Sequence, residues 1–271
     1  MNLCWADAEM TITENKITIN SELLGREVAC TILMPDELDA AQPVNLLLMN
    51  DGQETDALEL KSTLEKLHNS RSIKQTIVVG INAGEERLQE YGVAGRPDYK
   101  KRGAKADIYT DFIKSELLPA LKEVLPVHDF EVTAIAGLSL GGLTALDIAW
   151  NNPELFNKVG IFSGSLWWRS KELGKGYTEA DRIAHAMINE ATGKPELKFW
   201  FQTGTKDETA DRNKNGIIDS IDDTIDLIRE LENKGYTRPE DIAYIEVVGG
   251  KHDAATWAKA MPKFLVWAFG K

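Results

Sequence analysis

The sequence predicts an α/β fold with a mainly parallel sheet, on three observations. Short apolar, β-branched runs alternate with helical patterns over the 271 residues, which is typical of βαβ units. No internal repeat or low-complexity linker interrupts this alternation. The composition, 43% hydrophobic and 27% charged, is that of an ordinary globular protein. The length suits one large α/β domain or two small ones, and the unbroken alternation favours a single domain over residues 1–271.

Eight strands are expected, each a short run rich in β-branched or aromatic residues. They are residues 17–20, 27–34, 44–49, 76–81, 132–136, 158–162, 198–202 and 242–248. The first two flank Leu24-Gly25 and lie close together in the sequence, which predicts an antiparallel hairpin at the start of the sheet.

Six helices are expected between and after these strands. They are residues 56–70, 106–124, 142–151, 178–191, 221–234 and 254–269. A single apolar stripe marks the fifth of them: Ile221, Ile225, Ile228 and Leu231. Pro119 should kink or shorten the second, because proline lacks a backbone N–H and clashes with the preceding turn. Eight mostly parallel strands with helices on both faces indicate an α/β-hydrolase type of sheet.

Charge and cysteine content exclude several classes of protein. The formal net charge of −12 argues against nucleic acid or an anionic membrane as the main partner, because both attract basic surfaces. The N-terminal stretch MNLCWADAEM does not resemble a signal peptide, so we expect a cytoplasmic protein unless the sequence is a trimmed one. The two cysteines, Cys4 and Cys30, exclude a disulfide scaffold, and Cys30 should be a small buried residue.

The clearest chemical motif is the stretch AIAGLSLGG at residues 134–142. It matches the strand, Gly-x-Ser-x-Gly, helix turn that holds a serine above a sheet in a strained conformation. The alternative is an ordinary glycine-rich turn with an idle serine. A strand before the motif and a helix after it favour Ser139 as a nucleophile, with the backbone N–H of Leu140 as a donor to an oxyanion.

A serine nucleophile needs a base and an acid further along the chain. His252 follows the last expected strand, whereas His185 lies within a helical pattern and His68 precedes the serine. His128 also precedes it and is expected, like His68, to be structural or solvated. The acid should follow the strand at 198–202, where Asp207 is favoured and Glu208 is the alternative. Asp253 is expected to cap the final helix.

The second oxyanion donor is expected in the loop after the third strand, which reads MNDGQET. Gly52 permits close approach, and the backbone N–H of Gln53 is the candidate donor. A plain Asp-Gly turn is the alternative.

Seven stretches together resemble the putative-esterase family of α/β-hydrolases, which includes enterochelin, S-formylglutathione, feruloyl and acetylxylan esterases and mycolyltransferases. They occur in the family's order, and read NDGQ, RLQEYG, YTDFIKSELLP, GLSLGG, FSGSLWW, GTKDE and GGKHDAATW. The resemblance implies Ser139 as nucleophile, Asp207 as acid and His252 as base. Lys251 departs from the pattern, because many members run Gly-Gly-His directly, and the acid is the position that varies most within the family.

A second motif, DRNKNGIIDSID, begins at residue 211 and follows the spacing of an EF-hand calcium loop. The alternative is a hydrophilic loop with an aspartate cap. A strand precedes it where an EF-hand has a helix, so we expect a structural Ca²⁺ loop inserted at about residues 209–223 and no full EF-hand. Side-chain or carbonyl oxygens fall in register at Asp211, Asn213, Asn215, Ile217, Asp219 and Asp222. Catalysis itself needs no metal.

The loops after the strands should form the substrate site. Trp167 and Trp168 are expected to wall it, although packing under a helix is an alternative for at least one. The long segment 84–106 carries the basic stretch RPDYKKRGAK, which is expected either to bind an anionic substrate group or to be a solvated loop.

The expected activity is a serine esterase acting through an acyl-enzyme on a small-molecule ester. Resemblance alone favours a siderophore of the enterochelin type or an acylated carbohydrate. Two alternatives stay open, acyl transfer to an alcohol on the same residues and a non-catalytic calcium-dependent binding module. The oligomeric state is not predicted.

Overall fold

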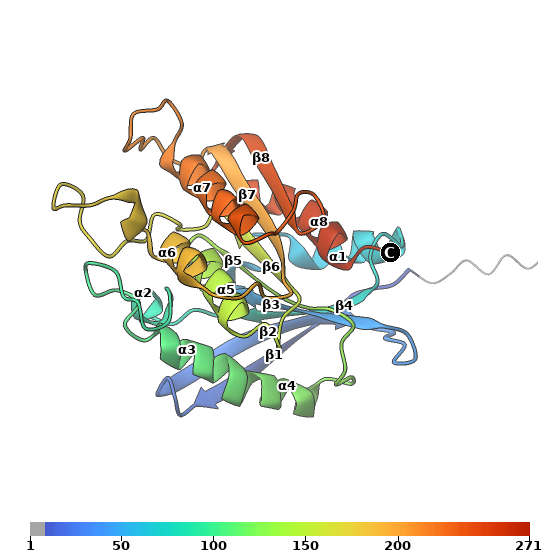
Figure 1. Cartoon of the computed structure of the whole chain (residues 1–271). Coiled ribbons are helices and arrows are strands. Elements are labelled where there is room, and N and C mark those ends of the chain that lie inside the picture. The colour runs from blue at the N-terminus through green and yellow to red at the C-terminus, as the bar shows by residue number, and fades with distance from the viewer. Residues whose placement is uncertain (1–8) are drawn as a thin grey trace, which may run out of the picture.

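The computed structural model describes residues 9–271. Cys4 and most of the stretch that argued against a signal peptide lie outside these residues. One eight-stranded sheet runs through the described chain in the order β1-β2-β4-β3-β5-β6-β7-β8 (Figure 1). Its strands are β1 (Ile12–Ser21), β2 (Arg26–Pro35), β3 (Val44–Asn50), β4 (Gln75–Ile81), β5 (Thr133–Leu138), β6 (Lys158–Phe162), β7 (Lys198–Lys206) and β8 (Ile242–Lys251).

The direction of the strands is as predicted. The hairpin β1–β2 is antiparallel, and β2 also pairs antiparallel with β4. All pairings from β4 through β3, β5, β6 and β7 to β8 are parallel. The carboxyl ends of β3 to β8 therefore meet at one edge of the sheet, which is where an open α/β sheet builds its site.

Helices cover both faces of the sheet, as expected (Figure 1). On one face α1 (Leu60–Asn69) and α8 (Ala254–Phe269) pack on side chains such as Leu47 and Val78. On the other face lie α3 (Ala106–Phe112), α4 (Leu118–Val124), α5 (Leu140–Asn151), α6 (Ile183–Glu190) and α7 (Asp219–Asn233). Cys30 is buried, as predicted, and it belongs to this second face.

The expected helix at 106–124 is divided at its middle. A π-helical segment, η2 (Ile113–Leu117), separates α3 from α4, and Pro119 lies in the first turn of α4. The break before Pro119 agrees with the predicted kink or shortening, because the ring cannot sit on an unbroken α-helical ladder.

Two short helices were missed by the sequence pattern, η1 (Gly52–Glu54) and α2 (Arg87–Glu90), and the helix expected at 178–191 is divided into η3 (Glu179–Asp181) and α6. Both missed helices are too short to show helical periodicity. Pro262 lies inside α8. Among residues 9–271, none of the helices is both long and apolar enough to cross a membrane.

Candidate active site

Ser139 sits on a strained turn between β5 and α5. Its φ of 54° and ψ of −118° are unfavourable for a side-chain-bearing residue. The turn is held by backbone hydrogen bonds from the N–H of Ser139 to Phe162 O, 2.8 Å, and from the N–H of Ser165 to Ser139 O, 3.0 Å. An ideal Cβ on Gly137 would lie 2.2 Å from the carbonyl oxygen of Gly141. The turn therefore closes only with glycine at position 137.

His252 lies against the hydroxyl of Ser139. Its Nε2 is 2.9 Å from Ser139 Oγ, within hydrogen-bond distance. The two residues are 113 positions apart in the sequence and come together because β5 and β8 end at the same edge of the sheet. The ring of His252 packs edge-on against Trp257, with centroids 5.2 Å apart. Asp253 caps α8, as predicted, by accepting the N–H of Thr256 at 2.9 Å.

Asp207 lies behind His252 at the end of β7. Its Oδ2 accepts the N–H of Gly204 at 3.0 Å, and the hydroxyl of Ser163 also hydrogen-bonds to the carboxylate. Its Oδ1 is buried and has no hydrogen-bond partner among the described residues. Burial raises the pKa of Asp207, while Gly204, Ser163 and the charge of His252 oppose that rise.

Glu208 faces a different part of the molecule. Burial raises its pKa, and its neighbours are the N–H of Ser220 and the carboxylates of Asp219 and Asp223. The groups whose charges act on His252 are Asp207, Asp253 and Arg87. Of the two carboxylates that the sequence left open, Asp207 is thus the one beside the histidine.

The pKa of His252 lies below its usual value of 6.5. Desolvation is the main cause, and the positive charge of Arg87 adds to it, while Asp207 and Asp253 oppose the shift. A lowered pKa keeps the imidazole neutral at neutral pH, which is the form that accepts a proton from a hydroxyl.

The two candidate oxyanion donors flank the serine turn. Leu140 is the first residue of α5, where backbone N–H groups lack partners within the helix. Gln53 lies in η1, directly after β3, and its side-chain Oε1 accepts the N–H of Ala83 at 3.0 Å. The side chain of Asn50 joins this loop to the turn by donating to Gly141 O at 3.0 Å.

Two serines of the stretch FSGSLWW were missed as parts of this site. Ser165 Oγ is 3.3 Å from Ser139 Oγ. Ser163 receives a hydrogen bond from Trp257 Nε1, 3.0 Å, and contacts Asp207. The sequence could have indicated both serines as site residues, because this stretch follows β6, and β6 lies between the strands that carry Ser139 and Asp207.

Other residues singled out from the sequence lie apart from the serine. His185 is buried in α6, where desolvation lowers its pKa to about 3, and its Nε2 bonds to Asp223 O. His128 is exposed.

Trp168 is buried, with 1% of its surface exposed, which leaves Trp167, half-buried beside it, as the one of these two tryptophans able to touch a ligand.

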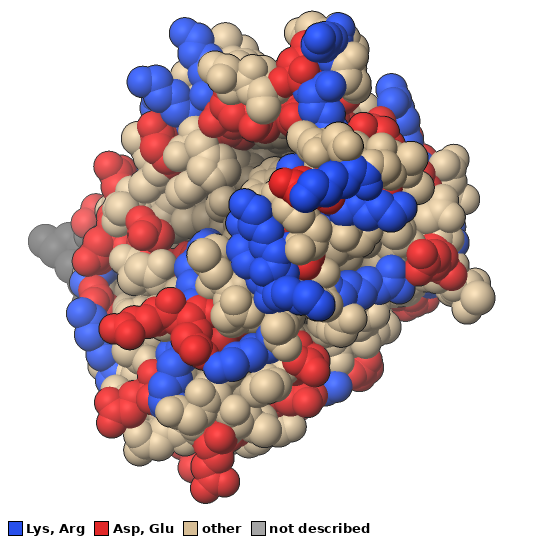
Figure 2. Space-filling model, turned by 90° about the vertical axis from the view of Figure 1, so that its left-hand side faces the viewer, with Lys and Arg blue, Asp and Glu red and all other residues tan. Residues whose placement is uncertain are grey.

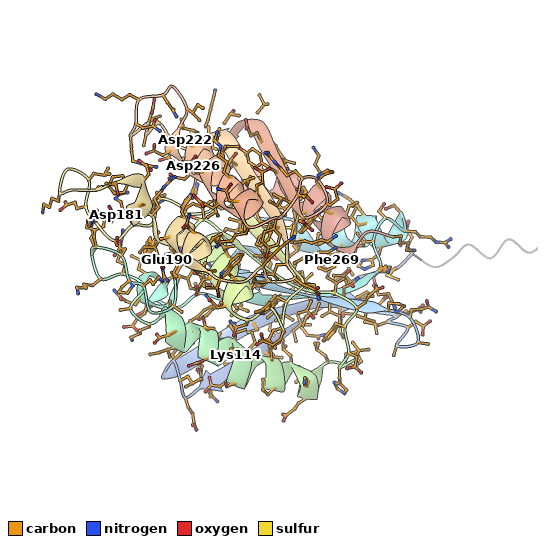
Figure 3. All side chains as sticks on the ribbon, in the orientation of Figure 1. Lys114, Asp181, Glu190, Asp222, Asp226 and Phe269 are labelled. Atoms are coloured by element: carbon orange, nitrogen blue, oxygen red, sulfur yellow. The ribbon has the colours of Figure 1, made fainter. Side chains whose placement is uncertain are left out.

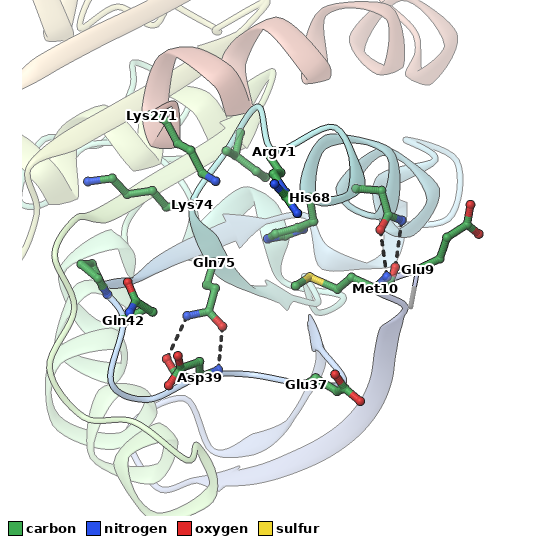
Figure 4. A pocket seen from close by; sticks show the side chains of 13 residues that line it. Glu9, Met10, Glu37, Asp39, Gln42, His68, Arg71, Lys74, Gln75 and Lys271 are labelled. Atoms are coloured by element: carbon green, nitrogen blue, oxygen red, sulfur yellow. Dashed lines mark hydrogen bonds between the residues drawn. The ribbon is translucent and has the colours of Figure 1, made fainter. Parts of the chain in front are cut away.

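A cavity of about 950 Å³ lies away from this site. Figure 4 shows His68, Arg71, Lys74, Gln75 and Lys271 among its lining residues. They come from the end of α1, the segment that leads into β4, the first residue of β4 and the chain's C-terminal end, so the cavity is at the opposite edge of the sheet from Ser139. His68 has both ring nitrogens hydrogen-bonded, to Leu64 O and to the N–H of Thr76, which agrees with its expected structural role.

Basic side chains gather on the face at the carboxyl ends of the strands. Figure 2 shows Lys and Arg beside a hollow on this side of the molecule. Arg169 lies among aromatic rings, 5.4 Å from the ring centroid of Tyr99 and 5.8 Å from that of Tyr177. Its Nε is buried and has no partner among the described residues. Arg102 pairs with the buried Asp98 and stacks on Trp168 at 4.7 Å.

The loop at 211–222 folds back on itself. Asp211 accepts the N–H groups of Asn215 and Gly216. The side-chain amides of Asn213 and Asn215 reach Asp222 Oδ2, at 2.6 and 3.1 Å, and Asp222 lies in the first turn of α7 (Figure 3). Asp219 instead contacts Arg212: its carboxylate accepts the backbone N–H of Arg212 and is 3.3 Å from the Arg212 guanidinium.

The chain matches a known protein family and several solved structures. A family model described as "Putative esterase" matches residues 21–268. An enterochelin esterase from Shigella flexneri superposes with a TM-score of 0.73 at 20% identity, over 94% of this chain and 57% of that one. A ferulic acid esterase gives a TM-score of 0.69 at 20% identity, over 96% and 98%. At these identities the solved structures show a shared fold, and that fold is the predicted α/β-hydrolase type.

The sequence is also similar to curated siderophore esterases. It is 44% identical to the iron(III) enterobactin esterase of Escherichia coli K12 over 155 residues, which are 57% of this chain and 34% of that protein. The chain thus spans only part of the length of this relative.

Proposed function

Because this chain belongs to the putative esterase family, we propose that it hydrolyses carboxylic esters through an acyl-enzyme formed on Ser139. The 2.9 Å contact between Ser139 Oγ and His252 Nε2 carries this proposal. A hydroxyl becomes a nucleophile when a neutral imidazole beside it accepts its proton. The strained turn that presents Ser139, and the lowered pKa of His252, both support this role.

In the first half of the reaction, Ser139 Oγ attacks the ester carbonyl carbon while His252 Nε2 takes its proton. The backbone N–H groups of Leu140 and Gln53 hold the resulting oxyanion. As the bond from carbon to the alcohol oxygen breaks, His252 returns the proton to that oxygen and the alcohol leaves. Asp207 orients His252 and stabilises its imidazolium, with Oδ1 as the atom available to Nδ1–H.

In the second half, water attacks the acyl-enzyme. His252 takes a proton from the water and then gives it to Ser139 Oγ as the acyl–oxygen bond breaks, so the carboxylic acid leaves and the serine is regenerated. No step uses a metal ion.

The proposed substrate is a siderophore ester, with an acylated carbohydrate as the alternative. Similarity to an iron(III) enterobactin esterase supports the first. The basic residues beside the hollow also support it, because they favour an acidic substrate on a protein whose net charge is −12.

An ester panel tests this substrate assignment. We expect p-nitrophenyl acetate to be hydrolysed slowly, and an iron-loaded catechol trilactone to give the highest kcat/KM. Methyl ferulate and an acetylated xylo-oligosaccharide serve as comparison substrates. A preference for either comparison substrate over the trilactone would contradict the siderophore assignment while leaving the esterase intact.

We also propose that the loop at 211–222 binds Ca²⁺ and stiffens the segment that carries Asp207. Among the described residues, no three His, Cys, Asp or Glu side chains form a metal-holding group, so the loop depends on its asparagines. Asp211, Asn213, Asn215 and Asp222 do gather there. Flipping the side-chain amides of Asn213 and Asn215 would direct their oxygen atoms, instead of their nitrogen atoms, toward a bound ion. Asp219, held by Arg212, fits the ninth position, which often binds through water.

Calorimetric titration with Ca²⁺ tests this site. We expect one site per chain with a dissociation constant in roughly the micromolar to millimolar range. Asp211→Ala should abolish binding, because it removes a ligand and releases the N–H groups of Asn215 and Gly216. Asp107→Ala, at an exposed carboxylate in the first turn of α3, is the control. Absence of heat at millimolar calcium would contradict the site.

A further inference from the structure

An ion pair between a half-buried arginine and a buried aspartate lies directly beside the serine turn. Asp51 follows β3 and is only 2% exposed. Its φ of 61° places it in the left-handed region, which is uncommon for a residue other than glycine. Arg87, from α2, binds its carboxylate in a bidentate manner, with Nε 2.6 Å from Oδ1 and Nη2 2.9 Å from Oδ2. Such two-point pairing fixes direction as well as distance.

This pair packs against both sides of the nucleophile. An ideal Cβ on Gly141 would lie 2.3 Å from Asp51 Oδ2, so the carboxylate occupies the space that a side chain at 141 would need. On the other side, Arg87 Nη2 is 3.5 Å from Leu138 O. Leu138, directly before Ser139, and Gly141, two positions after it, thus both contact the Asp51–Arg87 pair.

Two buried tyrosines form hydrogen bonds to the end of β3 and the loop that follows it. Tyr91 OH accepts the N–H of Asp51 at 3.2 Å, and Tyr109 OH donates to Asn50 Oδ1 at 2.8 Å. Both tyrosines are fully buried, and the guanidinium of Arg87 lies 5.0 Å from the ring centroid of Tyr91. The loop that leads to Gln53 is therefore fixed on one side by tyrosines and on the other by Arg87.

We propose that Arg87 is a positioning residue for the reaction, which through Asp51 sets the Gln53 N–H against the turn that carries Ser139. This inference rests on the proposed function. The Nε–Nη2 edge of the guanidinium is occupied by Asp51, so this edge of Arg87 acts on the reaction through that carboxylate. Misplacement of the oxyanion donor then lowers the rate of the chemical step more than it weakens substrate binding.

Arg87→Gln should lower kcat on the order of 100-fold with little change in KM. Arg87→Lys should fall between this variant and the wild type, since an ammonium keeps the charge but loses the two-point pairing. Arg87→Lys also keeps the proposal testable if the glutamine variant does not fold.

The pH profile supplies a readout that a merely structural role would not move. The charged groups that act on His252 are Asp207, Asp253 and Arg87, and Arg87 is the cation among them. Removing this cation makes protonation of His252 easier, so its pKa rises. Because hydrolysis needs the neutral imidazole, the acidic limb of kcat/KM should lie below pH 6.5 in the wild type and move to higher pH in Arg87→Gln.

The Arg26–Glu90 pair provides a matched control. It is also bidentate, at 2.8 and 2.6 Å, and its side chains are 21% and 1% exposed, against 29% and 3% for Arg87 and Asp51. Arg26→Gln should leave kcat and the acidic limb unchanged.

Two outcomes would overturn the role of Arg87. One is wild-type kcat and pH profile in folded Arg87→Gln. The other is a normal kcat in Asp51→Asn while Arg87→Gln is impaired, because Arg87 would then act without Asp51. A wild-type protein that hydrolyses no ester would instead refute the proposed function and this role with it.

Discussion

Replacing Ser139 by alanine is expected to lower kcat for ester hydrolysis by roughly 10⁶-fold. The change removes the atom that forms the acyl-enzyme and leaves only the oxyanion donors and substrate binding. Alanine keeps a Cβ at this left-handed position, where φ is 54°, so the strain of the turn is unchanged and the fold should be retained.

Steady-state hydrolysis of p-nitrophenyl acetate, with thermal melting of both proteins, measures this effect. Ser70→Ala, at the C-terminal end of α1, is a serine control away from the site and should retain full activity. Folded Ser139→Ala that keeps a tenth of the wild-type kcat would contradict the assignment of the nucleophile.

Asp207→Asn is expected to lower kcat on the order of 10⁴-fold. An amide carries no charge to stabilise the imidazolium of His252, and it can hold the ring in the wrong tautomer. The buried Oδ1 of Asp207 has no hydrogen-bond partner among the described residues, so this oxygen is available for the role.

Glu208→Gln is the matched control for that variant. The two carboxylates are adjacent in the sequence, and burial raises the pKa of each. Of these two carboxylates, Asp207 is the one whose charge acts on His252, so Glu208→Gln should change kcat little. The reverse result, an impaired Glu208→Gln and a normal Asp207→Asn, would make Glu208 the acid.

Strand ends made much of the site predictable. Ser139, Asp207 and His252 each follow a strand, and parallel strands bring their carboxyl ends together whatever the sequence separation. The distance of 113 residues between Ser139 and His252 therefore did not hide their contact. The eight strands were likewise recognisable, because β-branched runs are a local signal.

Side-chain direction was not predictable. Both Trp167 and Trp168 follow β6, but Trp168 turns into the core, where it packs against Gly92 and Gly103. The choice between Asp207 and Glu208 likewise depends on which way each side chain leaves β7, which neighbouring residues in a sequence do not reveal. Asp219 was expected in the calcium loop without any sign that Arg212 would hold it.

The network around Asp51 was missed for a different reason. The adjacent residues Asn50 and Asp51 belong to one segment and Arg87 and Tyr109 to two others, and Arg87 lies in a helix of four residues that has no periodicity. The stretches NDGQ and RLQEYG contributed to the family resemblance, but their contact with each other appears only when β3 and β4 are paired.

Labelling with a fluorophosphonate, followed by peptide mapping, tests the central claim most directly. The reagent modifies a serine that has a base beside it, whatever the natural substrate is. We predict one adduct per folded chain, on Ser139, and none in Ser139→Ala. No adduct on folded protein, or an adduct on a different residue, would contradict the claim that Ser139 is an activated nucleophile.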